Sequence, residues 1–214
     1  MFNLTWGFGS AFVNTFITGV VIPNSAALGP DKVGYFVALI PLTAAALSLP
    51  LAAATKWLGS KSPAMMLGSL AFLGFYLAFA VAAAGDDGCG GLAGNRSAYE
   101  QCGDESLTRT FGSWAALVPL LLLFGTGRAV WEGINKSVFA DAFPHCPAAA
   151  FANVELQSGG ATALAFFLFP LLRPLPQVLI CAVCAVLSIA GYFMAGRLPE
   201  KGTGPGKAAV VRSV

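Results

Sequence analysis

The sequence predicts an all-α membrane protein that crosses the bilayer six times. Of its 214 residues, 57% are apolar and only 10% are charged, whereas a soluble domain carries about 25% charged residues because water must wet its surface. The mean hydropathy of +0.74 indicates the same class. The apolar residues form six long runs, and each run has about the 20 residues that a helix needs to cross the hydrocarbon core.

The six predicted spans together form one transmembrane domain over residues 1–195. They cover residues 4–22, 34–55, 63–84, 111–131, 149–170 and 177–195. The first run could instead be a signal peptide, but no basic residue precedes it and polar residues interrupt it. The tail, residues 196–214, is rich in Gly and Lys, and we expect it to be disordered in the cytoplasm.

Lysine and arginine residues indicate the orientation, because short cytoplasmic segments carry an excess of them. With a cytoplasmic N-terminus, the cytoplasmic side holds Lys56, Lys61, Arg128, Lys136, Arg197, Lys201, Lys207 and Arg212. The opposite side then holds only Lys32, Arg96, Arg109 and Arg173. The sequence therefore predicts that both termini are cytoplasmic, in the plasma membrane or an endomembrane.

Residues 85–109 then form a long loop outside the cytoplasm, and two features of this loop agree with that side. Asn95 begins an Asn-Arg-Ser sequon, which is glycosylated only in a secretory compartment. Cys89 and Cys102 could close a disulfide, which needs an oxidising compartment, or they could stay reduced. We therefore expect that this loop can be glycosylated at Asn95 and can form the Cys89–Cys102 disulfide.

Small and polar side chains line one face of the first predicted helix. Asn3, Gly7, Ser10, Asn14 and Thr18 follow one another at intervals of three or four residues, which places them on one side of a helix. Polar side chains inside a bilayer face protein or a water-filled cavity. We therefore expect Asn3, Ser10, Asn14 and Thr18 to line a cavity, with interhelical packing as the alternative.

The remaining spans differ in polarity in a way that suggests an internal repeat. The third and sixth runs contain almost no hydrogen-bonding side chains, so we expect these two helices to be peripheral. The first and fifth runs are polar, so we expect them to line the central face. The sequence thus predicts two three-helix units of opposite orientation, the inverted repeat found in many transporters.

Residues 131–144, WEGINKSVFADAFP, form a polar stretch that we place at the cytoplasmic end of the fourth helix and in the next loop. Arg128, Glu132 and Lys136 share one helix face at i, i+4, i+8 spacing. Glu155 lies about two turns into the fifth run, where an unpaired carboxylate is costly, so we expect it to pair with Arg128 or Lys136. The cluster is either an anchor for a helix hairpin or an inner gate. Its members are Arg128, Glu132, Asn135, Lys136, Asp141, Asn153, Glu155 and Gln157.

The run GRAVWEGINKSVFADAFP, followed by AAAFANVELQSG, resembles the uncoordinated-93-like family of the major facilitator superfamily. That family has a Gly-Arg stretch with an aromatic-Glu pair, an Asn-Lys, an FADFFP-like segment, then AFAN and Gln-Ser. The matching positions are Gly127-Arg128, Trp131-Glu132, Asn135-Lys136, Phe139 to Pro144, Ala150 to Asn153 and Gln157-Ser158. The resemblance covers roughly residues 125–170. The loop TKWLGSKS lacks the acidic residue and the Gly-Arg-Lys ending usual in the superfamily, which puts a gating role for that loop in doubt.

The resemblance implies a twelve-helix fold of two six-helix halves, of which this chain is similar to the C-terminal half. Its partner would be an N-terminal six-helix half or a second copy. The function implied is transport of a small solute or ion by alternating access. Two alternatives stay open: a non-transporting adaptor that regulates a channel or the trafficking of a receptor, and a fragment of a truncated gene model.

Other functional classes find no support in the sequence. It contains no Ser-His-Asp grouping, no phosphate-binding Gly loop and no cluster of metal-ligating residues. We therefore expect no enzymatic activity, no cofactor and no metal. The net charge of +2 is small and spread along the chain, which gives no reason to expect nucleic acid as a partner.

Overall fold

The computed structural model describes residues 2–84 and 105–195, and within these residues the regular structure is entirely helical. Six helical segments are long and apolar enough to cross a membrane, as the sequence predicts. Asn95, Cys89, Cys102 and the tail, residues 196–214, lie outside the described residues. Residues 105–111, which include the described end of the predicted long loop, are helical.

The spans are built from the following elements. The first consists of α1 (Phe2–Phe12), the π-helical η1 (Val13–Val21) and α2 (Ile22–Asn24); the second of η2 (Pro30–Lys32) and α3 (Val33–Leu58); the third of α4 (Ser62–Ala84). The fourth consists of α6 (Trp114–Ala129), the π-helical η4 (Val130–Asn135) and α7 (Lys136–Ala142); the fifth of α8 (Pro147–Leu168) and η5 (Phe169–Leu171); the sixth of α9 (Pro174–Ala195).

The helix of the fourth span continues past residue 131, the predicted end of the apolar run, as far as Ala142. The polar residues of the stretch do not stop the helix, because opposite charges four residues apart support one another on a helix surface. The helix ends just before Pro144, whose ring cannot continue it. Pro147 then begins α8 at its first position, where the fixed φ of proline suits a helix start.

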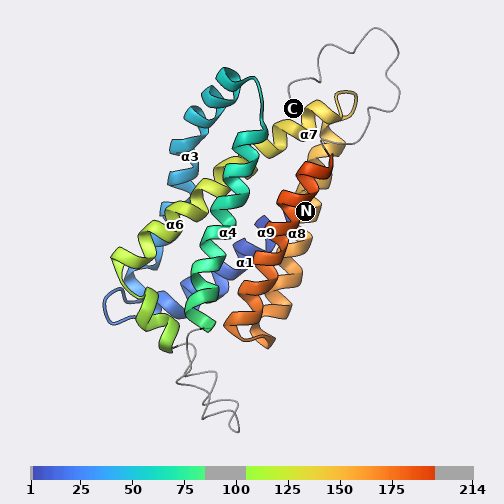
Figure 1. The fold of residues 1–214 in the computed structure, drawn as a ribbon. Helices are drawn as coiled ribbons and strands as arrows, with labels where there is room; N and C mark the ends of the chain where they lie inside the picture. The colour runs from blue at the N-terminus through green and yellow to red at the C-terminus, as the bar shows by residue number, and fades with distance from the viewer. Residues whose placement is uncertain (1, 85–104, 196–214) are drawn as a thin grey trace.

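The packing of the six spans has an internal correspondence. The first span packs on the fifth (α1 on α8), and the second packs on the fourth (α3 on α6). The third packs on the sixth (α4 on α9) and on α6, and α1 also packs on α9. Suppose that the first, second and third spans are exchanged with the fourth, fifth and sixth, respectively. Each of these contacts then coincides with a contact that is already in the set. Figure 1 shows α3 at one edge of the bundle and α4 crossing its middle.

Glycines allow close approach at two of these contacts, those of α1 with α8 and of α3 with α6. A Cβ atom on Gly7 of α1 would lie 2.4 Å from the carbonyl oxygen of Ser158 in α8. A Cβ atom on Gly125 of α6 would lie 2.7 Å from the Cβ of Thr43 in α3. Small residues let membrane helices approach closely enough for their backbones to pack. The two glycines occupy corresponding spans, the first and the fourth.

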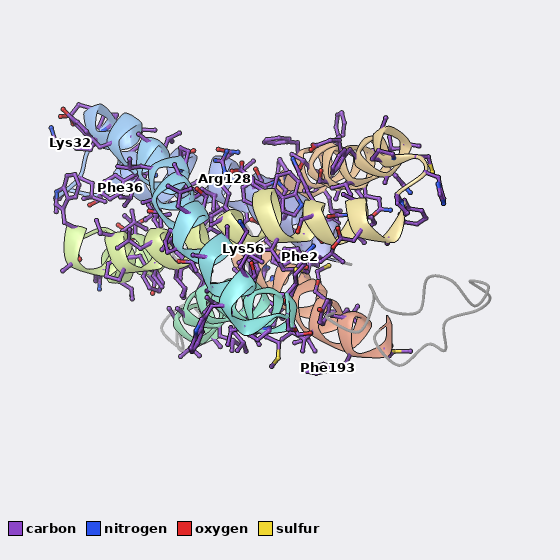
Figure 2. The ribbon with its side chains drawn as sticks, turned by 90° about the horizontal axis from the view of Figure 1, so that it is seen from above. Phe2, Lys32, Phe36, Lys56, Arg128 and Phe193 are labelled. Carbon is purple, nitrogen blue, oxygen red and sulfur yellow. The ribbon has the colours of Figure 1, made fainter. Side chains whose placement is uncertain are left out.

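The third span is central, so the expectation that it is peripheral is wrong. Phe72, Phe75 and Phe79 of α4 are fully buried, and α4 contacts α6 and α9 along its length. The sixth span is more peripheral, because Val183 is 56% exposed and Phe193 lies on the rim in the view from above (Figure 2). An apolar side chain packs as well against protein as against lipid, so apolar composition alone does not distinguish the two.

We expect Gly7→Ala to destabilise the bundle by about 1–3 kcal/mol, the usual cost of overpacking. Its added methyl group would collide with backbone, which cannot move as a flexible side chain can. Gly159→Ala is the matched control, since a Cβ at Gly159 would meet nothing within 4 Å. Thermal unfolding of the two variants in the same detergent provides the measurement. Equal stabilities would contradict the close approach of α1 and α8.

Candidate functional site

A buried side-chain amide joins the first, fourth and fifth spans. Asn3 is 2% exposed, and its Nδ2 donates to Gln157 Oε1 of α8 at 3.0 Å. Its Oδ1 accepts from Asn135 Nδ2 at 2.8 Å and from Trp131 Nε1 at 3.3 Å. Gln157 in turn donates to Asn153 Oδ1 at 3.2 Å. The buried amide is therefore satisfied by three partners from two other spans, as a low-dielectric environment requires.

The π-helical element η4 provides two of these partners. Trp131 and Asn135 are four residues apart within η4, and both donate to the same oxygen of Asn3. A π-helical turn is wider than an α-helical one and is found disproportionately at functional sites. The first span contains a second π-helical element, η1. The two π-helical elements thus lie in corresponding spans.

A group of stacked aromatic rings lies beside the amide network. Phe124 and Trp131 are two helical turns apart on the fourth span, and Trp6 of α1 contacts both. The ring centroids of Trp6 and Trp131 are 4.9 Å apart at an interplanar angle of 20°, and those of Trp6 and Phe124 are 5.6 Å apart at 28°. Stacked aromatic pairs each contribute about 0.5–1.5 kcal/mol beyond their buried area, so these rings stabilise the contact between the first and fourth spans.

Two cations complete this junction. The guanidinium carbon of Arg128 lies 5.4 Å from the Trp6 ring centroid, and the Lys136 ammonium lies 4.6 Å from that of Trp131. Both distances are within the range of a cation–π interaction. Each cation is also paired with a carboxylate: Arg128 Nε donates to Glu132 Oε1 at 2.8 Å, and Lys136 Nζ lies 2.7 Å from Glu155 Oε1.

The expected ion pair of Glu155 is confirmed, and its partner is Lys136. Arg128, the other candidate partner, pairs within its own helix. The side chain of Glu155 is 56% exposed, so the pair is not buried in protein. A third pair joins Lys61, in the turn between α3 and α4, to Asp141 of α7. The connection between the second and third spans therefore lies at the same end of the bundle as the connection between the fourth and fifth spans. The charge pattern predicts that both are cytoplasmic.

Arg128 lies at the middle of the fourth helical segment. The fourth span runs from Trp114 to Ala142, 29 residues in all, so Arg128 is fourteen residues from either end. The sequence predicts that Arg128, Glu132 and Lys136 share one helix face, and the continuous helical segment from Trp114 to Ala142 contains all three. In the view from above, Arg128 lies among α1, α3 and α6 inside the outline of the bundle (Figure 2).

A pocket of about 60 Å³ opens beside Arg128, between the first, second and fourth spans. Ser10 and Asn14 are among its lining residues, as are Trp6 and Phe124. The other two cavity candidates lie elsewhere: Asn3 is buried in the amide network, and Thr18 donates from its hydroxyl to the backbone oxygen of Asn14 at 2.7 Å. The complete lining is Trp6, Ser10, Val13, Asn14, Val37, Ile40, Phe124 and Arg128.

Sequence reasoning overlooked the aromatic members of the site, Trp6 and Phe124. One signal was present: Trp6 and Trp131 each lie within one turn of a polar residue predicted to face inward, Asn3 and Asn135 respectively. An aromatic ring on the polar face of a membrane helix is a candidate for stacking with a cation.

Comparisons with family models, curated proteins and solved structures found no match to this chain.

We expect Asn3→Ala to lower the free energy of unfolding by about 1–3 kcal/mol, because it leaves buried amide and indole N–H groups without an acceptor. Asn14→Ala is the control, since the Asn14 side chain is exposed and donates a long hydrogen bond of 3.5 Å to Ser10 Oγ. Thermal unfolding in detergent would compare the two variants. If Asn14→Ala cost as much as Asn3→Ala, the amide network would not be the main stabilising contact.

The Lys136–Glu155 pair allows a double-mutant cycle. We expect Lys136→Met and Glu155→Gln each to cost about 0–1 kcal/mol, because the pair is largely exposed. Together the two changes should be non-additive, since both remove the same contact. Arg128→Gln combined with Glu155→Gln is the matched control and should be additive, because Arg128 pairs with Glu132. Coupling in the control cycle and none in the Lys136 cycle would contradict the observed pairing.

Proposed function

We propose that this chain is one six-helix unit of a transporter-like membrane protein that moves a small solute or ion by alternating access. The observation that carries the proposal is the mid-span pocket lined by Arg128, Ser10 and Asn14. Ionisable residues inside a membrane span are rare and commonly mark substrate or ion pathways. The resemblance of residues 125–170 to the uncoordinated-93-like family is consistent with this function.

We further propose that the unit consists of two inverted three-helix repeats, as in one half of a major facilitator transporter. Three features support this: the exchange of contacts between the two sets of spans, a π-helical element in the first and fourth spans, and a close-approach glycine in each of the same two spans. A rigid pair of repeats around a mid-membrane site is the arrangement that allows alternating access.

A second six-helix unit is part of the proposal, supplied by another segment of the same protein or by a second copy. The second and fifth spans support it, because only 17% and 28% of their most apolar windows are buried. We propose that both termini are cytoplasmic. The Lys61–Asp141 and Lys136–Glu155 pairs support this orientation by gathering basic residues at one end.

A non-transporting adaptor is the second candidate, and the size of the pocket favours it. A typical ligand site encloses about 300–1,000 Å³, whereas this pocket has about 60 Å³. In a transporter, the small volume would describe one closed conformation of a site that opens to each side in turn. In an adaptor, the pocket would stay small and would not open to both sides of the membrane.

Cysteine accessibility distinguishes these candidates. In a variant with all five native cysteines replaced, Asn14→Cys should react with a membrane-impermeant thiol reagent added from either side, because alternating access exposes the pocket to both aqueous phases. Val183→Cys is the control: this residue is exposed near the middle of α9 and is not one of the residues that line the pocket, so it should not react. Labelling of Asn14→Cys from one side only would favour the adaptor, and no labelling from either side would contradict a water-accessible pocket.

A further inference from the structure

The Arg128 guanidinium uses one of its donors and presents the others to the pocket. Its Nε donates to Glu132, and Arg128 is one of the residues that line the pocket. A guanidinium has five N–H donors in a fixed plane. Among the described residues, the recorded contacts of this group are Glu132 and the Trp6 ring. The terminal amino groups are therefore available to a ligand in the pocket.

The same two contacts hold the guanidinium in place before any ligand arrives. Glu132 is four residues further along the same helix and fixes the Nε edge, and the Trp6 ring supports the planar group at 5.4 Å. Trp6 is itself held between Phe124 and Trp131. A positioned arginine loses less conformational entropy on binding, and its planar fork suits a carboxylate better than a point-charged lysine would.

The rest of the pocket combines hydrogen-bond donors with apolar walls. Ser10 and Asn14 contribute a hydroxyl and a side-chain amide, both of which can donate to an anion. Val37 and Ile40 of α3 contribute an apolar wall on another side. A single water needs about 10–15 Å³ of such space, so a pocket of about 60 Å³ has room for a group of several heavy atoms.

We propose that this pocket binds a small organic anion, a short-chain monocarboxylate. Its carboxylate accepts hydrogen bonds from the terminal amino groups of Arg128 and from Ser10 or Asn14, and its alkyl chain packs against Ile40 and Phe124. The proposal names the substrate class of the proposed transporter and rests on that function for its physiological meaning. Glu132 partly neutralises Arg128, so it weakens the binding of the anion.

Tryptophan fluorescence offers a direct binding measurement, because Trp6 contacts Arg128. In the full chain with Trp57→Phe and Trp114→Phe, only Trp6 and Trp131 remain as tryptophans. We expect sodium butyrate, titrated into the detergent-solubilised protein at constant ionic strength against sodium chloride, to cause a saturable change in emission. Thr126→Ala is the matched control on the same helix, since Thr126 is outside the lining, and it should bind as the parent does.

Three variants test the role of the guanidinium. Arg128→Gln should weaken butyrate binding by at least about tenfold, and Arg128→Lys should weaken it by less, because the charge stays and the fork is lost. Glu132→Gln should strengthen binding several-fold by removing the competing carboxylate. If Arg128→Gln fails to fold because Glu132 is left unpaired, Arg128→Gln combined with Glu132→Gln removes both charges and should still lose binding.

The results separate this proposal from the proposed function. The anion site is overturned if butyrate shows no saturable binding. It is also overturned if the variant with both Arg128→Gln and Glu132→Gln binds butyrate as tightly as the parent protein. A response to sodium chloride equal to that with butyrate shows a general anion effect and overturns the carboxylate assignment. If Asn14→Cys is labelled from both sides while butyrate fails to bind, the transporter proposal survives without this substrate class. If butyrate binds while labelling occurs from one side only, the anion site stands in a protein that does not transport.

Discussion

The architecture depends on the satisfaction of one buried amide, that of Asn3. Hydrocarbon offers no hydrogen-bond partners, so a polar side chain in a membrane bundle must find them in protein. Asn3 does so through Gln157, Asn135 and Trp131, and these contacts set the relative positions of the first, fourth and fifth spans. The stacking of Trp6 on Trp131 follows from that placement. The position of Trp6 in turn provides the surface that supports Arg128, so the pocket depends on the amide network two turns away.

Hydropathy was sufficient to predict the six spans, because length and apolarity are what a bilayer requires. It was not sufficient to predict which spans are central. The phenylalanines of α4 are buried against α6 and α9, yet the same side chains would suit contact with lipid. Polarity gave better information. The polar face of the first span predicted cavity-lining roles for Ser10 and Asn14, which do line the pocket, but also for Asn3 and Thr18, which do not. The costly carboxylate of Glu155 predicted an ion pair, which Lys136 provides.

The fourth helical segment continues well past its apolar part, because its charged residues are paired. Between Arg128 and Lys136 the charges alternate at four-residue intervals, and the aromatic rings of the first and fourth spans accept the two cations. Paired in this way, the charges cost less inside a helix than isolated charges do. The pairing across spans depends on tertiary contacts between Trp6 and Arg128, residues more than a hundred positions apart, and no local pattern in one sequence contains that information.

The π-helical element η1 has a mechanical consequence for the first span. Nine consecutive residues, Val13–Val21, follow the wider winding, and such winding is rare compared with the α-helix. An α-helix turns by about 100° per residue. If η1 changed to α-helical winding and so gave up one extra residue, the part of the first span that follows it would rotate by about that angle relative to α1. Asn14 sits at the start of this element and Trp6 before it. The first span thus has two segments. The segment that contains Asn3 and Trp6 is held in place by their contacts, and the orientation of the segment after it depends on whether η1 keeps its π-helical winding.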